Sequence, residues 1–211
     1  MTLEIASFVI GPYQNNTYLI ADKQSGSAVV IDPSFECKVV LDHDRQKNWR
    51  IQEIWLTHAH FDHYTGAALI ASAYQPVLQV RLHADDLELW RSGGNAKNFG
   101  HEFDPGPEPS LQFTHGQILT VGDVEMEIRH APGHTAGHVV IYCLSAEVLF
   151  CGDVIFQDSI GRTDLPGADY ENLLSSIRTQ VLTLPDATRL LSGHGPETTV
   201  EREKQFNPFL T

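Results

Sequence analysis

Three histidines and one aspartate lie close together in the segment THAHFDH, residues 57–63. The four residues are His58, His60, Asp62 and His63. Imidazole nitrogens and carboxylate oxygens are the ligands that first-row transition metals take from proteins. A single histidine in a loop is usually an ordinary polar residue, whereas four potential ligands this close together fit that explanation poorly. The segment therefore predicts a metal site.

The flanking sequence predicts how this cluster is held. Residues 51–57, IQEIWLT, form an apolar run with β-branched and aromatic residues, which is typical of a buried strand. In the following stretch, Ala67, Ile70, Ala71 and Tyr74 fall on one face of a predicted helix. The cluster is therefore expected on a strand-to-helix loop that is anchored at both ends.

Isolated residues of the same chemical types follow three other strand-like segments. His134 lies in HAPGHTAGH, Asp153 follows the apolar run LFCG, and His194 stands between two glycines in LLSGHGP. Glycines on both sides of a histidine allow its backbone to approach another group closely. Because four groups on one loop cannot all reach one ion in good geometry, these residues indicate a second ion.

The pattern HxHxDH, with the later segments in the same order, resembles the metallo-β-lactamase-fold hydrolases. The resemblance extends from about residue 3 to the end of the chain. It implies an α/β fold, a four-layer αββα sandwich, and the order strands, helix, strands, helix agrees with two packed sheets covered by helices. We expect one such domain over residues 1–211.

The resemblance also assigns the ligands of two divalent metal ions. Zinc is the expected metal, and iron or manganese would suit the same ligand types. Asp62 and Asp153 are the expected catalytic carboxylates. The first ion would be held by His58, His60 and His134, the second by Asp62, His63 and His194, and Asp153 would bridge both.

Two cations about 3.5–4 Å apart can hold a bridging water and lower its pKa from 15.7 towards neutrality. The resulting hydroxide would attack an activated carbonyl, with Asp62 or Asp153 orienting it. The segment GRTD, residues 161–164, resembles a branch with small glyoxalase II-like hydrolases and persulfide dioxygenases. The closest resemblance implies a thioester substrate such as S-lactoylglutathione, and Arg162 and Asp164 are expected to pair beside the site.

The end of the chain departs from full-length glyoxalase II enzymes. Those enzymes carry a C-terminal helical domain that grips glutathione, whereas this chain ends soon after His194 and resembles the small single-domain group. We therefore expect no such helical domain, and a different thioester remains open.

Three alternatives remain. A persulfide dioxygenase would use one iron held by His58, His134 and Asp153, although Gly195-Pro196 replaces the Asp-Tyr typical of that family. A non-catalytic metal-binding module is the second alternative, and phosphodiester hydrolysis in nucleic acid is the third. The net charge of −13 argues against nucleic acid as a partner.

Several residues near these motifs have expected supporting roles. Asp32, at a strand end before Pro33, is either a turn former or, as the resemblance implies, a support for the ligand loop. His138 is expected to support the site and His130 to be a strand residue. The glycine- and proline-containing segment 93–110 is expected to be a surface loop that could still shape the substrate mouth. The remaining histidines, expected to be ordinary polar groups, are His43, His83, His101 and His115.

Composition limits the environment of the protein. Three cysteines do not suggest a disulfide framework, and Cys143 and Cys151 lie in apolar runs. The sequence contains no apolar run approaching 18 residues, and its start does not resemble a signal peptide. We expect a cytoplasmic protein without a membrane or nucleic-acid partner that acts on a small molecule. The sequence does not indicate an oligomeric state.

The remaining elements follow from apolar periodicity and turn residues. A helix over 169–184 is the clearest, with Tyr170, Leu173, Leu174, Ile177, Val181 and Leu184 on one face. The other expected strands are 3–10, 16–21, 27–32, 77–83, two within 117–130 joined at Gly122-Asp123, 138–144, 147–151 and 188–192. The other expected helices are 34–49, a short one over 84–92 and one from about Glu197.

Overall fold

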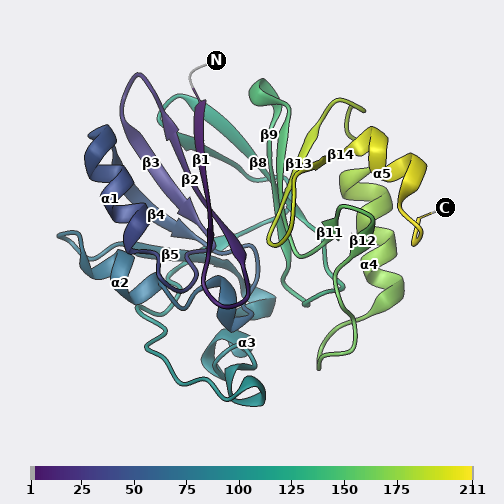
Figure 1. Cartoon of the computed structure of the whole chain (residues 1–211), viewed down its shortest axis with the longest axis horizontal. Coiled ribbons are helices and arrows are strands. Elements are labelled where there is room, and N and C mark those ends of the chain that lie inside the picture. Colours follow the sequence, from purple (N-terminus) through teal and green to yellow (C-terminus); the bar gives the residue numbers. More distant parts are fainter. Residues whose placement is uncertain (1–2, 211) are drawn as a thin grey trace.

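Two six-stranded sheets pack face to face in the computed structural model, which describes residues 3–210 (Figure 1). The strand order is β1-β2-β3-β4-β5-β6 in the first sheet and β14-β13-β10-β9-β8-β7 in the second. A separate two-stranded hairpin, β11-β12, lies beside the second sheet. Residues 1, 2 and 211 of the domain expected over 1–211 lie outside the described residues.

The bounds of the elements are as follows. The first sheet contains β1 (Leu3–Ile10), β2 (Asn15–Asp22), β3 (Ser27–Ile31), β4 (Arg50–Trp55), β5 (Gln79–His83) and β6 (Leu111–Phe113). The second contains β7 (Ile118–Val121), β8 (Val124–His130), β9 (Val139–Cys143), β10 (Val148–Gly152), β13 (Arg189–Ser192) and β14 (Thr198–Thr199). The hairpin is β11 (Ile155–Phe156) and β12 (Ser159–Ile160), and the helices are α1 (Lys38–Lys47), α2 (Ala67–Ser72), α3 (Leu87–Arg91), α4 (Tyr170–Ser176) and α5 (Val200–Phe206).

The central strands β2, β9 and β10 are buried on both faces, which explains their nearly continuous apolar runs in the sequence. Along β2, Tyr18 and Ile20 point between the sheets, whereas Leu19 and Ala21 point towards α1 and α2. The outer face of the second sheet packs against the α4 segment through residues such as Leu149 and Leu173. Figure 1 shows α1 and α2 outside the first sheet and α4 and α5 outside the second. The predicted four-layer αββα sandwich is confirmed.

The strand directions bring the predicted ligand loops to one edge of the sandwich. In the first sheet β3, β4, β5 and β6 are parallel neighbours, and in the second β10 and β13 are parallel. The loops after the carboxyl ends of β4, β10 and β13 carry residues 57–63, Asp153 and His194, respectively. A single β-bridge between Asn15 and His194 joins the two halves of the sandwich at this edge.

The structure shortens two expected helices. The helix expected over 34–49 is α1 alone, which ends where Asn48 takes a left-handed conformation. The helix expected over 169–184 is α4 followed by a π-helical turn, Ile177–Val181. Tyr170, expected on the buried face, is 43% exposed. It is the first residue after the Asp169 N-cap, whose side chain accepts a hydrogen bond from the Asn172 amide, so it lies outside the packed stripe.

The C-terminal helix begins later than expected, at Val200, because Thr198 and Thr199 pair with β13 as the short strand β14. Within residues 3–210, none of the helices has the length and hydropathy that crossing a bilayer requires.

Two leucines, five positions apart, test the packing of the outer core layer. Leu149 is fully buried against the α4 segment, whereas Leu144 is 70% exposed. Leu149→Ala should lower the free energy of unfolding by about 2–5 kcal/mol, because it leaves a cavity in a packed interior. Leu144→Ala should change it by less than about 0.5 kcal/mol. Urea denaturation of metal-free protein measures both, and equal effects would contradict the four-layer packing.

Candidate metal centre and its surroundings

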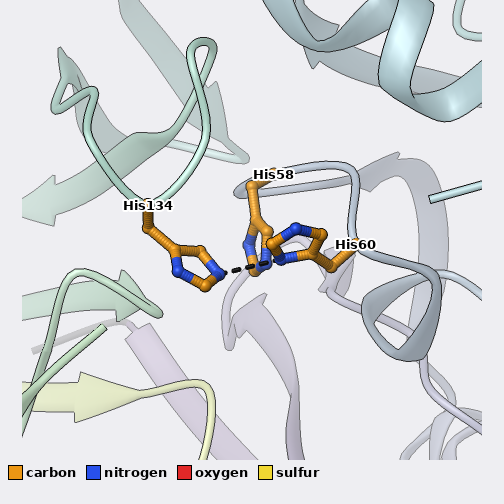
Figure 2. Close-up of side chains that lie close together, drawn as sticks. All are labelled: His58, His60 and His134. Atoms are coloured by element: carbon orange, nitrogen blue, oxygen red, sulfur yellow. Dashed lines mark hydrogen bonds between the residues drawn. The ribbon is translucent and has the colours of Figure 1, made fainter. Parts of the chain in front are cut away.

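Three of the predicted ligands, His58, His60 and His134, form one buried group (Figure 2). Figure 2 shows their rings converging from two separate loops. The Nδ1 of His60 lies 2.8 Å from the Nε2 of His134. The ring centroid of His58 lies 4.9 Å from that of each of the other two. One potential ligand atom from each residue lies within 4.8 Å of the others.

Asp62, His63 and His194 form a second group of the same kind. The Oδ2 of Asp62 lies 3.3 Å from the Nε2 of His194 and 3.7 Å from the Nε2 of His63. His63 is fully buried, and Asp62 and His194 are partly accessible. The 3-10 turn Phe61–His63 sends His60 and Asp62 in different directions, so one short segment contributes to both groups.

Asp153 lies between the two groups. Its Oδ1 is 3.4 Å from the Nε2 of His63, and its Oδ2 is 3.7 Å from the Nε2 of His134 and 3.6 Å from the Nε2 of His194. The carboxylate therefore faces residues of both groups, which is the position that a bridging ligand requires. The structure thus brings all seven predicted ligand residues together.

Two glycines make room for Asp153. A Cβ atom added to Gly193 would lie 2.2 Å from Asp153 Oδ1, and one added to Gly161 would lie 1.9 Å from the Asp153 carbonyl oxygen. Neither position can accept a side chain without displacing that aspartate. The glycine before His194 therefore serves close approach, as its sequence context predicted.

Asp32 supports the first ligand loop, as the resemblance implied. Its Oδ1 accepts the Thr57 amide at 2.8 Å, and its Oδ2 accepts the Thr57 hydroxyl at 2.6 Å and the Nδ1–H of His63 at 3.0 Å. Because Nδ1 of His63 is the donor, its Nε2 is left facing the second group. Asp32 also follows β3 with a left-handed backbone conformation, φ +49°, which turns the chain at the end of the strand. Asp32 is therefore both a turn former and a support for the ligand loop.

Backbone carbonyls orient two other histidines. The Nδ1 of His134 donates to the carbonyl oxygen of Arg162 at 2.9 Å, and the Nδ1 of His194 donates to that of Tyr13 at 3.0 Å. In metal sites such bonds fix the tautomer of a ligating histidine and direct its other nitrogen towards the ion. The Nε2 of each histidine faces the Asp153 carboxylate here.

His138 has the supporting position expected for it. Its Nε2 accepts the backbone N–H of Asp153 at 3.1 Å, and its ring stacks on His58 with centroids 4.7 Å apart. It therefore holds the backbone of the central carboxylate without entering either group.

Asp86 is a supporting residue that the sequence analysis missed. Its buried carboxylate accepts hydrogen bonds from the Ala59 amide at 2.9 Å, the Thr135 hydroxyl at 2.7 Å and the Gly137 amide at 2.6 Å. Burial raises the pKa of Asp86, and these three bonds oppose that rise. The side chain joins the loop of His58 and His60 to the loop of His134. In the sequence it was only an acidic residue at a helix start.

Asn15 is the second missed residue. Its Nδ2 donates to Asp62 Oδ2 at 2.9 Å and lies 3.3 Å from His194 Nε2. The neighbouring Asn16 donates to the carbonyl oxygens of Ser192 and Gly195. The sequence analysis gave Asn15 no role and placed Asn16 at the start of the expected strand 16–21. A run of two asparagines is an ordinary turn signal, so the sequence offered no means of recognising this role.

The electrostatics of the first group favour neutral imidazoles. Burial and neighbouring histidines lower the pKa of His58 well below its usual value and lower the pKa of His60 to about 3. Burial also lowers the pKa of His134. These histidines therefore carry free lone pairs at neutral pH, the form in which imidazole binds metals.

The second group instead retains charges of both signs. Burial would raise the pKa of Asp62, but the positive charge of His63 and hydrogen bonds from His194 and Asn15 lower it to about 2. The pKa of His63 and of His194 is raised, because Asp153 and Asp62 outweigh burial. The carboxylates thus require positive charge beside them, which bound cations would supply.

Unpartnered polar atoms test whether the residues fit a metal. Among the described residues, the buried side-chain atoms without a hydrogen-bond partner include His58 Nε2, His63 Nε2 and Asp153 Oδ1. Burying such atoms without a partner is unfavourable, and here they converge from separate loops. The donor set therefore fits divalent transition-metal ions.

The loop after α3 takes part in the site more than expected. The His101 Nε2 lies 2.8 Å from the Tyr13 hydroxyl, and its ring stacks on Phe61 with centroids 5.3 Å apart. Gly94, Asn95 and Phe99 line the cavity that opens onto the two groups. Gly94, Asn95 and Phe99 therefore form part of the cavity wall, which agrees with the expectation that the surface segment 93–110 could shape the substrate mouth.

The remaining predicted features have simpler outcomes. Arg162 and Asp164 form the expected pair, with two contacts of 2.7 Å. His83 and His130 stack with centroids 4.1 Å apart near Asp85 and form a further group of potential ligands. Because the two rings are nearly parallel, their lone pairs do not converge on one point.

The three cysteines are buried and unpaired.

The Metallo-beta-lactamase superfamily model matches residues 10–194, which carry all seven predicted ligands. The chain belongs to the metallo-β-lactamase superfamily. Its members are metal-dependent hydrolases. This chain is 36% identical to the hydroxyacylglutathione hydrolase GloC of Haemophilus influenzae, over all of this chain and 98% of the relative.

Solved structures extend the comparison. The chain superposes on the BLEG-1 B3 metallo-β-lactamase with a TM-score of 0.91 and 34% identity, covering 99% of this chain and 100% of that one. The structure of TTHA1623 in a di-iron-bound form superposes with a TM-score of 0.88 and 36% identity, and the match covers 97% of this chain and 100% of that one. ETHE1 from Myxococcus xanthus superposes with a TM-score of 0.81 and 24% identity, and the match covers 97% of this chain and 83% of that one. At this level of identity the comparison shows a shared fold alone.

Substitutions of Asp86 and of its neighbour Asp85 test whether Asp86 links the loop of His58 and His60 to the loop of His134. Asp86→Ala leaves three buried donors without their acceptor and should lower the free energy of unfolding by about 3 kcal/mol or more. It should also weaken metal retention, because both loops of the first group lose a common support. The control is Asp85→Ala, whose side chain is exposed. Urea denaturation and metal content after dialysis measure the effects, and indistinguishable variants would contradict this role of Asp86.

Proposed function

We propose that the protein is a metal-dependent thioester hydrolase that works with two divalent ions. The observation that carries this proposal is the position of Asp153 between two groups of three potential ligands. Zinc is the expected metal, and the di-iron-bound state of TTHA1623 makes iron the first alternative, ahead of manganese. The proposed ligands are His58, His60 and His134 for one ion, Asp62, His63 and His194 for the other, and Asp153 for both.

The proposed reaction follows from what these groups can do. Ions bound there would lower the pKa of a water molecule, polarise a carbonyl oxygen and stabilise negative charge on it. Asp62 is ionised at neutral pH and borders the cavity, and Asn15 holds one of its carboxylate oxygens. Its other oxygen is available to orient the attacking water and accept its proton. The enzyme's nucleophile then does not need to be a serine or cysteine.

A thioester is the proposed substrate class because the name of GloC describes a hydroxyacylglutathione hydrolase. S-Lactoylglutathione, hydrolysed to lactate and glutathione, is the first substrate to test. Because BLEG-1 is described as a metallo-β-lactamase, a β-lactam belongs in the same assay panel. The cytoplasmic location stays a prediction.

Persulfide dioxygenase activity is the second candidate. His58, His134 and Asp153 form a set of two histidines and one carboxylate, the ligand pattern of non-haem iron oxygenases. The fold likeness to ETHE1 keeps this candidate open. The complete second group favours the hydrolase, because a mononuclear site has no need of His63 and His194 as ligands.

Replacing one histidine tests the first group. His58→Ala should lower thioester hydrolysis at least about 100-fold, because it removes a proposed ligand. The fold should persist, since this histidine lies on a loop above the packed sheets. His115→Ala, at an exposed histidine, is the control. Hydrolysis is followed by thiol release and the fold by circular dichroism. Retained turnover in His58→Ala would rule out the proposed site.

His194→Ala separates the two candidates. In a two-metal hydrolase it should reduce metal content from about two ions per chain to about one and abolish thioester hydrolysis. In a mononuclear dioxygenase it should leave one iron and most of the oxygen uptake with glutathione persulfide. Elemental analysis, a thiol assay and an oxygen electrode decide between these outcomes. One iron per wild-type chain with persulfide-dependent oxygen uptake would overturn the hydrolase proposal.

A further inference from the structure

The cavity above the two ligand groups has mostly apolar walls. It encloses about 550 Å³, within the size range of small-molecule sites. Asp62, His134 and Asp153 reach its floor, where a reacting carbonyl would lie. The walls come from elements far apart in the chain, and their apolar members are Tyr13, Phe61, Phe99, Phe156, Ile160 and Leu165.

The aromatic residues of one wall form a continuous layer. Tyr13 and Phe61 meet edge to face with centroids 5.4 Å apart, and Phe99 packs against Phe61 at 5.5 Å. Even so, Phe99 is 40% exposed, although burial of a large aromatic side chain is favourable. Because Phe99 also lines the cavity, it contributes uncovered apolar surface to this wall.

The walls lack free positive charge. Among the described residues lining the cavity, Arg162 is the only lysine or arginine. Its guanidinium is already engaged by both oxygens of Asp164, at 2.7 Å each. The pKa of Asp164 is lowered to about 2, chiefly by this hydrogen bonding, so the pair is ionised and mutually neutralised at neutral pH.

This chemistry differs from what a glutathione conjugate needs. Glutathione carries two carboxylates, and proteins usually bind carboxylates with arginine, lysine or clustered N–H donors. The only such cation in the described lining, Arg162, is paired with Asp164, the amides Asn95 and Gln157 are uncharged and come from separate segments, and the net charge of the chain is −13. Apolar walls instead stabilise a substrate by removing its hydrocarbon from water.

We propose that the cavity selects thioesters bearing an apolar substituent, rather than glutathione conjugates. This inference rests on the proposed thioester hydrolysis and specifies its substrate. The ions and carboxylates at the floor act on the thioester group, and the aromatic and aliphatic walls hold an alkyl or aryl chain. The chain can belong to the acyl group or to the thiol, and separate substrate series distinguish these two sources.

The first experiment measures kcat/KM of the metal-loaded enzyme. One series is N-acetylcysteamine thioesters from acetyl to octanoyl, the other is acetyl thioesters of ethanethiol to hexanethiol, and the reference is S-lactoylglutathione. In the series whose chain enters the cavity, kcat/KM should rise two- to fourfold per methylene, since about 0.8 kcal/mol corresponds to fourfold. The longer members should exceed S-lactoylglutathione at least tenfold.

A variant pair assigns the effect to the wall. Phe99→Ala should flatten the rise with chain length and raise KM for the octanoyl thioester more than it lowers kcat. The control is Phe209→Ala, which is 44% exposed and does not line the cavity. It should retain the wild-type slope. The same chain-length slope in Phe99→Ala and wild type would overturn the role of this wall.

Two further outcomes distinguish failure of the inference from failure of the function. Thioester turnover without chain-length dependence, or with S-lactoylglutathione preferred, overturns the apolar selection and leaves the hydrolase intact. A preference for S-lactoylglutathione that disappears in Arg162→Gln would identify Arg162 as a carboxylate anchor instead. If no thioester is hydrolysed, calorimetric binding of unreactive thioethers with the same chains still tests the cavity, and chain-independent affinity overturns it.

Discussion

The carboxylate of Asp32 holds the first ligand loop to the end of the first sheet, and the geometry of the site depends on it. It receives the Thr57 amide, the Thr57 hydroxyl and the Nδ1–H of His63. These bonds compensate the burial of its charge, because buried carboxylates need hydrogen-bond donors or opposite charge. They also decide which nitrogen of His63 faces Asp153. A second buried carboxylate, Asp86, accepts hydrogen bonds from the loop of His58 and from the loop of His134 and so holds these two loops together.

The edge that carries these loops concentrates histidines and carboxylates, whereas the interior layers of the sandwich are largely apolar. Three apolar layers, one between the sheets and one beneath the helices on each side, stabilise the framework. The edge instead holds the seven predicted ligand residues together with Asp32, Asp86 and His138, and several of these side chains have buried atoms without a partner. Functional sites often break the local rules that a fold otherwise follows, and the surrounding structure compensates for them. Here the supporting carboxylates and backbone carbonyls provide that compensation.

The local ligand pattern and the strand-like runs before it indicated a metal site, whereas the family resemblance implied the four layers and the assignment of the seven ligand residues. The sequence analysis missed Asp86 and Asn15, since each acts on loops far away in the chain and resembles an ordinary helix-start or turn residue. It placed Tyr170 on a buried face because periodicity does not show where a capped helix begins. It left open whether segment 93–110 shapes the substrate mouth, because the ring contacts of Phe99 and His101 with Phe61 join residues far apart in the chain.

Gly161 and Gly193 limit how this site can change over evolution or by design. Even one methyl group at either position would collide with Asp153. The floor of the cavity therefore tolerates little change in shape, whereas wall residues outside the ligand loops, such as Phe99, can be exchanged without disturbing it. New specificities on this scaffold should arise by altering the rim, and attempts to reshape the centre should lose the ions before they gain a substrate.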